Sequence, residues 1–358
     1  MNISTAVTAG AVILIVLGAL CGALSGIGRS AVRLVLLVLC FFAALAAASP
    51  LAGLVPSDAV TAAAGDRGAE LCREIPTLGS LAAALPRALA APLMFAAVFV
   101  LLALVTVFLV PVLSRLIFGA GRARGILSRI FGGLCGAVCA LAAVWVLLMP
   151  AAGYTAAAGE IVAASDKEAL TSSLDADEYL GGLRGLFSAC ETLDGALGDN
   201  AALGTVGKCG GERMFDSLGR MKNVIEGEDI PLSDCAPSLA RAVSVFAPFA
   251  GVSPADYGQA QIDAAYQAAD IVEEDALVRN IAAEMLRGVS SAWLDGKEFC
   301  GMEKPQVNIL VRPAFDALLA KLAATDAESL ATEARTAART AAGLVELAIK
   351  YKNRTSLY

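Results

Sequence analysis

The 358-residue sequence contains no histidine. Its absence removes the commonest general acid or base, the commonest metal ligand and every Ser–His or Cys–His nucleophile pair. The nine cysteines include no pair separated by two residues, so a zinc site or a thioredoxin-like redox site has no support either. We therefore predict that the protein is not an enzyme and has no catalytic residue, metal or cofactor.

Charged residues are scarce in the first 150 positions, which hold nine of the 27 basic and four of the 34 acidic residues. Residues 151–358 hold the other 18 basic and 30 acidic residues, a net charge of −12. A surface this acidic is a poor partner for nucleic acid or for anionic lipid. The change in composition near Pro150 predicts two domains, residues 1–150 and residues 151–358.

Long apolar runs occupy most of the first domain. Four of them, at residues 7–27, 31–54, 88–113 and 130–149, have the roughly 20 residues that a helix needs to cross a bilayer. Their only charged residue, Arg33, stands near the start of the second run, where its side chain can reach the interface. The sequence thus predicts an all-α protein, in which two transmembrane helical hairpins precede an extracytoplasmic helical bundle.

The short links between the runs predict the orientation in the membrane. The first and third links contain arginine and no acidic residue, whereas the second link mixes four acidic residues with three arginines. By the positive-inside rule the two arginine links are cytoplasmic, and both chain termini are extracytoplasmic. The arginines that carry this prediction are Arg29, Arg33, Arg115, Arg122, Arg124 and Arg129.

Small residues recur every four positions in the first and fourth runs. This spacing lets two helix backbones approach closely, which favours helix packing in lipid. It predicts a packing seam within one chain or between chains of a homo-oligomer, although an alanine-rich membrane helix can show the same pattern by composition alone. The residues are Gly18, Gly22 and Gly26 in the first run, and Gly132, Gly136 and Ala140 in the fourth.

The polar residues inside the runs that are candidates for a transport pathway are Ser25, Ser49 and Thr106. Ion-coupled transporters and proton pumps usually need carboxylates within the membrane, and these runs have none. The sequence therefore argues against a pump or a secondary transporter, and it leaves open a passive pore formed by an oligomer.

Two segments, residues 124–148 and residues 25–39, combine basic residues and glycines with a long aliphatic run, and in this they resemble the colicin V production (CvpA) family of bacterial inner-membrane proteins. RGILSRIFGGLCGAVCALAAVWVLL, residues 124–148, has the family's basic residue, spaced glycines and long aliphatic run. SGIGRSAVRLVLLVL, residues 25–39, corresponds to the segment after the first span, with Gly28, Arg29 and Arg33 but without the family's aromatic and acidic residues. The resemblance implies a multi-pass protein of the bacterial inner membrane. It also implies a role in colicin V or toxin production or export and in envelope physiology, and no catalytic residues.

The second domain has the pattern of a helical bundle that folds on its own. Thr325 and Glu328 have capping-box spacing before the last amphipathic helix. Ser253 and Pro254 predict another helix start, and residues 270–294 carry apolar residues at helical spacing. We find no sustained alternation with a period of two, and so we predict no sheet.

Acidic clusters and cysteines are the remaining candidate site residues. The clusters at residues 175–178 and 273–275 could hold calcium or act as acid and base, but helix starts also favour acidic residues, and we interpret both clusters as solvated faces. Cys190, Cys209, Cys235 and Cys300 predict two disulfides with three possible connectivities, and Cys72 makes the number odd. The alternative is that all five are free thiols.

We therefore expect a non-enzymatic membrane scaffold or export-accessory protein of the CvpA type. Its partners are the lipid bilayer and another envelope or extracellular protein, which the second domain would bind, and nucleic acid is not among them. The alternative is an oligomeric passive channel or solute-export subunit built on the glycine seams. A third hypothesis, with less support, is an envelope enzyme that uses the acidic clusters.

Overall fold

The computed structural model describes residues 3–63, 65–118, 125–164, 181–225, 228–246, 248, 252–288, 295, 298–299 and 302–355. Four helices are long and apolar enough to cross a membrane: α1 (Ile3–Ser25), α2 (Ile27–Ala52), α5 (Pro76–Phe118) and α6 (Ile126–Ala164). Many of their large apolar side chains are exposed, as is expected for surfaces that face lipid. The prediction of four such helices is confirmed.

Two of the four helices run well beyond the predicted spans. α5 begins at Pro76, not near residue 88, and α6 continues past residue 149 to Ala164. Pro150 lies inside α6, so the predicted boundary between two domains falls within a helix. Hydropathy marks only where the apolar run ends, whereas the alanine-rich sequence after Pro150 keeps a high helix propensity and continues the helix.

The four helices pack in pairs, α1 against α6 and α2 against α5, and α2 also contacts α6. Phe95, Phe99 and Met149 are each less than 2% exposed and occupy the space between α2, α5 and α6. Ala44 and Ala48 on α2 have no exposed surface and let the neighbouring helices approach. This layer of the four-helix part is therefore filled by side chains.

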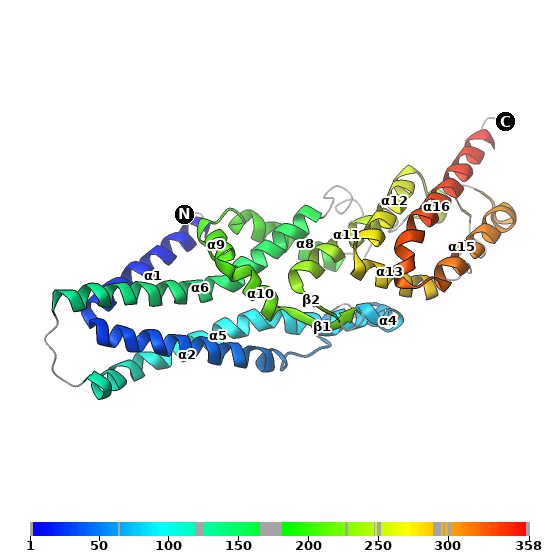
Figure 1. Cartoon of the computed structure of the whole chain (residues 1–358). Coiled ribbons are helices and arrows are strands. Elements are labelled where there is room, and N and C mark those ends of the chain that lie inside the picture. The colour runs from blue at the N-terminus through cyan, green and yellow to red at the C-terminus, as the bar shows by residue number, and fades with distance from the viewer. Residues whose placement is uncertain are drawn as a thin grey trace.

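The turn between α1 and α2 lies at the same end of the molecule as the end of α5 and the start of α6 (Figure 1). We call this the arginine end, since the described arginines of both links are near it. The opposite end carries α3 (Ala59–Ala63), α4 (Gly65–Glu74) and the residues that follow α6. The described arginines of the two links are Arg29, Arg33, Arg115 and Arg129, and Arg122 and Arg124 lie outside the described residues.

Residues 181–355, which we call the C-terminal part, are mostly helical and lie beside and beyond the far end of α6 (Figure 1). The elements are α8 (Gly181–Leu197), α9 (Ala201–Val206), the π-helix η1 (Gly207–Gly211), α10 (Glu212–Leu218), β1 (Arg220–Ile225), β2 (Glu228–Pro231), α11 (Leu232–Phe246), the 3₁₀-helix η3 (Pro254–Asp256), α12 (Gln259–Glu274), α13 (Ala276–Gly288), α14 (Lys304–Gln306), the π-helix η5 (Val307–Val311), α15 (Arg312–Ala324) and α16 (Ala327–Thr355).

The antiparallel pair β1–β2 corrects the prediction that the chain has no sheet. The register of the pair shifts between Met221 and Ile225, which marks a bulge. Met221 and Val224 are the buried residues of β1 and are three positions apart. Because the bulge breaks the alternation of buried and exposed residues, this short strand has the sequence pattern of a helix.

The helix starts also differ from the predicted ones. Asp326, not Thr325, caps α16, because its carboxylate accepts a hydrogen bond from the Ser329 amide at 2.6 Å. Asp275 divides the helix predicted at residues 270–294, and it accepts amide hydrogen bonds from the first turn of α13. Ser253 accepts an amide hydrogen bond in η3, a single turn, and α12 begins later at Gln259. In each case an Asp or Ser side chain fixes the break.

The C-terminal part shares two hydrophobic cores with the long helices α2, α5 and α6. Leu203, Val206, Phe215 and Leu232 belong to the same core as Phe95 and Met149. Met221, Val224, Cys235 and Leu277 form a second core with Leu81 and Ala88 of α5. A third core, between α12, α13, α15 and α16, is built within the C-terminal part. The structure therefore argues against the expectation that this part folds independently of α5 and α6.

Candidate functional site

The two stripes of small residues face each other between α1 and α6. A Cβ atom on Gly22 would lie 2.8 Å from the Cα atom of Gly136, and one on Gly132 would lie 2.6 Å from the Gly22 carbonyl oxygen. A Cβ atom on Gly18 would collide with the methyl group of Ala140. The two backbones approach too closely for side chains at these positions. In this single chain the two stripes lie against each other.

Gly26 has a further role in the turn between α1 and α2. Its φ angle is 76°, in the left-handed region that side chains disfavour. Its amide donates to the Gly22 carbonyl at 2.9 Å, and the Ser30 hydroxyl donates to the same oxygen at 3.3 Å. The amide of Ile27 donates to the Ser128 hydroxyl oxygen at 3.2 Å, which joins this turn to the start of α6.

Asn200 joins the C-terminal part to the start of α1. Its side-chain oxygen accepts the amides of Ala202 and Leu203 at 3.0 Å and so caps α9. Its side-chain nitrogen donates to the carbonyl and the hydroxyl oxygen of Ser4 at 2.7 and 3.0 Å, and the Thr8 hydroxyl donates to its oxygen at 3.4 Å. Asn200 is only 2% exposed, so these bonds satisfy a polar group that is shielded from solvent.

Replacing Asn200 with Ala should destabilise the protein by about 1–3 kcal/mol, because the helix cap and the two hydrogen bonds from Asn200 to Ser4 are lost. Asn200→Ser keeps an oxygen for the cap but cannot reach Ser4, and it should cost about half as much. Thermal unfolding in detergent, followed by circular dichroism, measures both effects. If Asn200→Ala and the unchanged protein have the same melting temperature, the hydrogen bonds of Asn200 add nothing to stability.

Glu284 makes a second connection, between α13 and the start of α5. Its two carboxylate oxygens accept the amide and the hydroxyl of Thr77, both at 2.9 Å. The Thr77 amide is one of the donors that a helix leaves unpaired in its first turn, where a negative charge is also favoured by the helix dipole. The C-terminal part is thus hydrogen-bonded to two of the four long helices, and the shared cores lie between these two connections.

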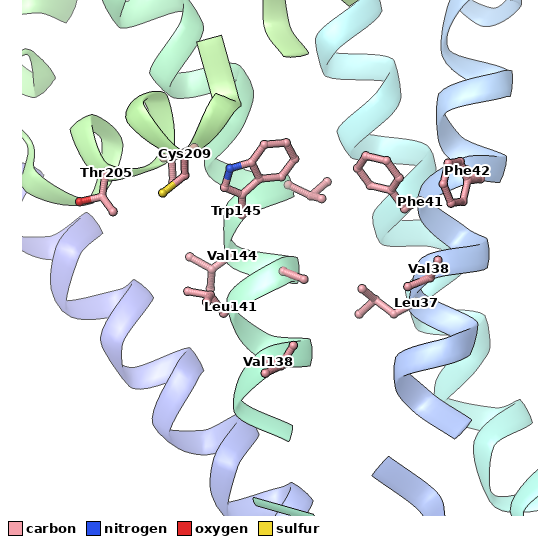
Figure 2. Close-up of a pocket in the computed structure, with 13 residues that line it drawn as sticks. Leu37, Val38, Phe41, Phe42, Val138, Leu141, Val144, Trp145, Thr205 and Cys209 are labelled. Carbon is pink, nitrogen blue, oxygen red and sulfur yellow. The ribbon is translucent and has the colours of Figure 1, made fainter. Parts of the chain in front are cut away.

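An apolar cavity of about 530 Å³ lies between α2 and α6 (Figure 2). We call it the α2–α6 groove. Its walls carry Val38 and Phe42 from α2 and Val138 and Leu141 from α6, all at least 45% exposed, so the groove opens sideways. Thr205 and Cys209 border it on the side of the C-terminal part. The complete lining is Leu37, Val38, Phe41, Phe42, Val138, Leu141, Ala142, Val144, Trp145, Val146, Thr205, Val206 and Cys209.

The aromatic wall of the groove is held in place by ring contacts. The ring of Phe41 packs edge-on against the buried ring of Phe95, with 5.4 Å between the ring centroids. The centroids of the Phe41 and Trp145 rings are 6.5 Å apart. Figure 2 shows the indole nitrogen of Trp145 on the side of the ring that faces Cys209. The indole N–H has no acceptor among the described residues. Apart from Thr205 and Cys209, the groove offers a ligand a hydrogen-bond donor only from Trp145.

No family model, curated protein or solved structure matches the chain. The CvpA resemblance stays a prediction from the sequence.

The predicted disulfide cysteines are not joined in the structure. Cys190, Cys209 and Cys235 are free, and Cys300 lies outside the described residues. If these four cysteines formed two disulfides, at least one disulfide would join two of Cys190, Cys209 and Cys235. The described residues contain no such disulfide. Burial raises the pKa of Cys235 to about 12 and raises the pKa of Cys190 above its usual value, so both stay protonated at neutral pH.

The acidic cluster at residues 273–275 has local roles in the structure. Asp275 caps α13, and Glu273 pairs with Arg335 of α16 at 2.6 Å on the surface. The cluster at residues 175–178 lies outside the described residues. Within the described part of the chain, His, Cys, Asp and Glu side chains do not gather in threes as a metal site would require. The polar residue Thr106 bonds to its own helix, at the Ala103 carbonyl.

Three residues that matter in this structure were not singled out from the sequence: Trp145, Asn200 and Glu284. A signal for Trp145 was present, because tryptophan near the end of a span is typical of a membrane interface. Asn200 and Glu284 look like an ordinary cap residue and an ordinary helix-surface acid. Their partners are 196 and 207 positions away in the sequence, and no local pattern reports such pairs.

Proposed function

We propose that this chain is a non-enzymatic membrane scaffold of the CvpA type. Four helices would anchor it in the bacterial inner membrane, with both termini extracytoplasmic, and the C-terminal part would bind an envelope or extracellular partner. The resemblance at residues 124–148 associates such a scaffold with colicin V or toxin production or export. The observation that carries the proposal is the pair of hydrophobic cores that the C-terminal part shares with α5 and α6.

An anchor alone would need only a flexible linker after the last membrane helix. Here α6 continues past Pro150 to Ala164 and packs against α8, α10 and α11, and Asn200 and Glu284 add hydrogen bonds to α1 and α5. These contacts hold the C-terminal part in one position relative to the four long helices. Fixed presentation is useful to a protein that positions a partner, because less freedom is lost on binding. The net charge of residues 151–358 is −12, which favours a partner with a basic surface.

The alternative, a passive channel, finds less support in the packing. Phe95, Phe99 and Met149 fill the layer between α2, α5 and α6. A polar path in that layer would have to displace them, so a pore would have to form between chains. The small-residue stripes of α1 and α6 are already used against each other within one chain. They are therefore not free to serve as the contact between chains on which this alternative depends.

One experiment tests both the orientation and the partner. Ile309 on η5 is 73% exposed, and Leu116 near the arginine end is 82% exposed, so they give a matched pair of positions for a new cysteine. A membrane-impermeant maleimide that carries a photoreactive group is applied to intact cells whose envelope layers outside this membrane are permeable to it. Labelling is compared with that of the unchanged chain, which corrects for native thiols.

We expect Ile309→Cys to be labelled in intact cells and Leu116→Cys only after lysis. Illumination should then join Ile309→Cys to one partner protein of constant mass. Labelling of Leu116→Cys alone would reverse the orientation. Ion flux through liposomes that contain the purified protein, together with the absence of any photo-adduct at Ile309, would replace the scaffold with the channel.

A further inference from the structure

We propose that the α2–α6 groove binds one acyl chain of an ester lipid, taken from the leaflet next to the C-terminal part. The lipid's ester carbonyl would accept a hydrogen bond from the Trp145 indole N–H. This inference concerns a different surface from the proposed partner site, and it does not depend on the scaffold function.

The polarity of the groove changes along its length as a lipid's polarity does. α2 and α6 both begin at the arginine end, so Leu37 and Val138 lie deeper in the membrane than Phe42 and Trp145. The deep end is wholly apolar and fits hydrocarbon. The polar atoms, from Trp145, Thr205 and Cys209, gather at the other end, beside the C-terminal part (Figure 2).

Trp145 supplies the donor that would fix the lipid's position. It is four residues from the end of the apolar run, where tryptophan rings sit among lipid carbonyls at the membrane interface. Its N–H has no acceptor among the described residues, and such a donor costs free energy if it stays unpaired in an apolar environment. The Thr205 hydroxyl already donates to the Ala201 carbonyl at 2.7 Å, so Trp145 is the stronger candidate.

The shape of the groove suits a single chain better than a helix. A volume of about 530 Å³ lies within the usual range for small-molecule sites, roughly 300–1,000 Å³. Thr205 and Cys209 border the groove at its end beside the C-terminal part, where they would obstruct a straight helix of a second copy, which is about 10 Å across. Phe41, held edge-on by Phe95, keeps the wall in position without a ligand, so that binding requires little rearrangement.

The test is native mass spectrometry of the full chain, released from micelles that contain a dioleoyl phosphatidylglycerol or its ether-linked analogue. Val38 lines the groove and is 45% exposed, whereas Val35 on the same helix is 60% exposed and does not line it. Val38→Phe fills the groove with a ring, and Val35→Phe places the same ring on open lipid-facing surface. Melting of both variants in detergent confirms that they are folded.

The unchanged chain and Val35→Phe should each retain one lipid, and Val38→Phe should lose most of it. Trp145→Phe keeps a ring but lacks the N–H. It should reduce retention of the ester lipid about two- to tenfold, the effect of one hydrogen bond, and leave the ether lipid unchanged. Equal retention by Val38→Phe and Val35→Phe, or no retained lipid, would disprove the site. If the spectra show a dimer of the chain in place of one chain with one lipid, the groove binds a second copy. If Trp145→Phe loses the ester and the ether lipid equally, the proposed contact with the ester carbonyl is disproved.

Discussion

A chain that begins at Ala158 is expected to aggregate, or to stay in solution only as a species that binds a hydrophobic dye. Composition alone suggests the opposite, because residues 151–358 are acidic and long enough for a core of their own. The structure places eight buried residues of the shortened chain in cores that also contain residues of α2, α5 or α6 before position 158: Leu203, Val206, Phe215, Met221, Val224, Leu232, Cys235 and Leu277.

The expected loss is large compared with the stability of a domain. Fully burying one Val, Leu, Phe or Met side chain contributes roughly 1.5–3 kcal/mol, and a whole domain is stable by about 5–15 kcal/mol. Phe215, which is 1% exposed, packs its ring on Gly153 of α6 and 4.9 Å from the ring of Tyr154. Removal of residues 1–157 takes away that whole surface. Loss of only a few such contacts is enough to unfold the region around α9, α10 and the β1–β2 pair.

Co-expression of residues 1–157 as a second chain provides the control. If the shared cores are the cause, the two fragments should associate in the membrane, and the C-terminal fragment should then be recovered folded in detergent. The readouts are size-exclusion chromatography, circular dichroism and dye binding. A soluble, monomeric and helical fragment in the absence of residues 1–157 would show that these cores are dispensable.

The four long helices could be predicted because the bilayer sets a simple rule for the sequence. A helix that crosses lipid needs a long apolar run, and the runs at residues 7–27 and 31–54 fall close to α1 and α2. The ends of α5 and α6 were misplaced because apolarity and helix formation are separate properties. In water the alanine-rich sequence after Pro150 stays helical when it can pack, and Phe215 and Leu232 supply that packing.

The groove and its surroundings could not be predicted, because they depend on which distant segments meet. Val38 and Val138 have the pattern of ordinary lipid-facing residues, and part of the lining comes from α9 and η1, far along the chain. The bulge in β1 and the cap at Asp326 were missed for a simpler reason. Each depends on one backbone detail, to which a pattern summed over many residues is insensitive.

Gly22→Leu and Gly136→Leu are each expected to destabilise the protein by about 3 kcal/mol, at the upper end of the usual cost of overpacking. The reason is the kind of atom that the new side chain meets. A Cβ atom on Gly22 would already lie 2.8 Å from the Cα atom of Gly136, and backbone atoms cannot rotate away as a flexible side chain can. The helices α1 and α6 would have to separate, which would also pull Ser4 away from Asn200.

Gly10→Leu is the matched control, since Gly10 lies on the same helix and a Cβ atom there would meet nothing within 4 Å. It should leave the melting temperature unchanged or raise it, because leucine has a higher helix propensity than glycine. Circular dichroism melts in detergent compare the three variants at equal protein concentration. If Gly22→Leu melts together with Gly10→Leu, the close approach of α1 and α6 is not required. If dilution of the unchanged protein lowers its melting temperature and the glycine variants lose this dependence, the seam forms between chains and not within one.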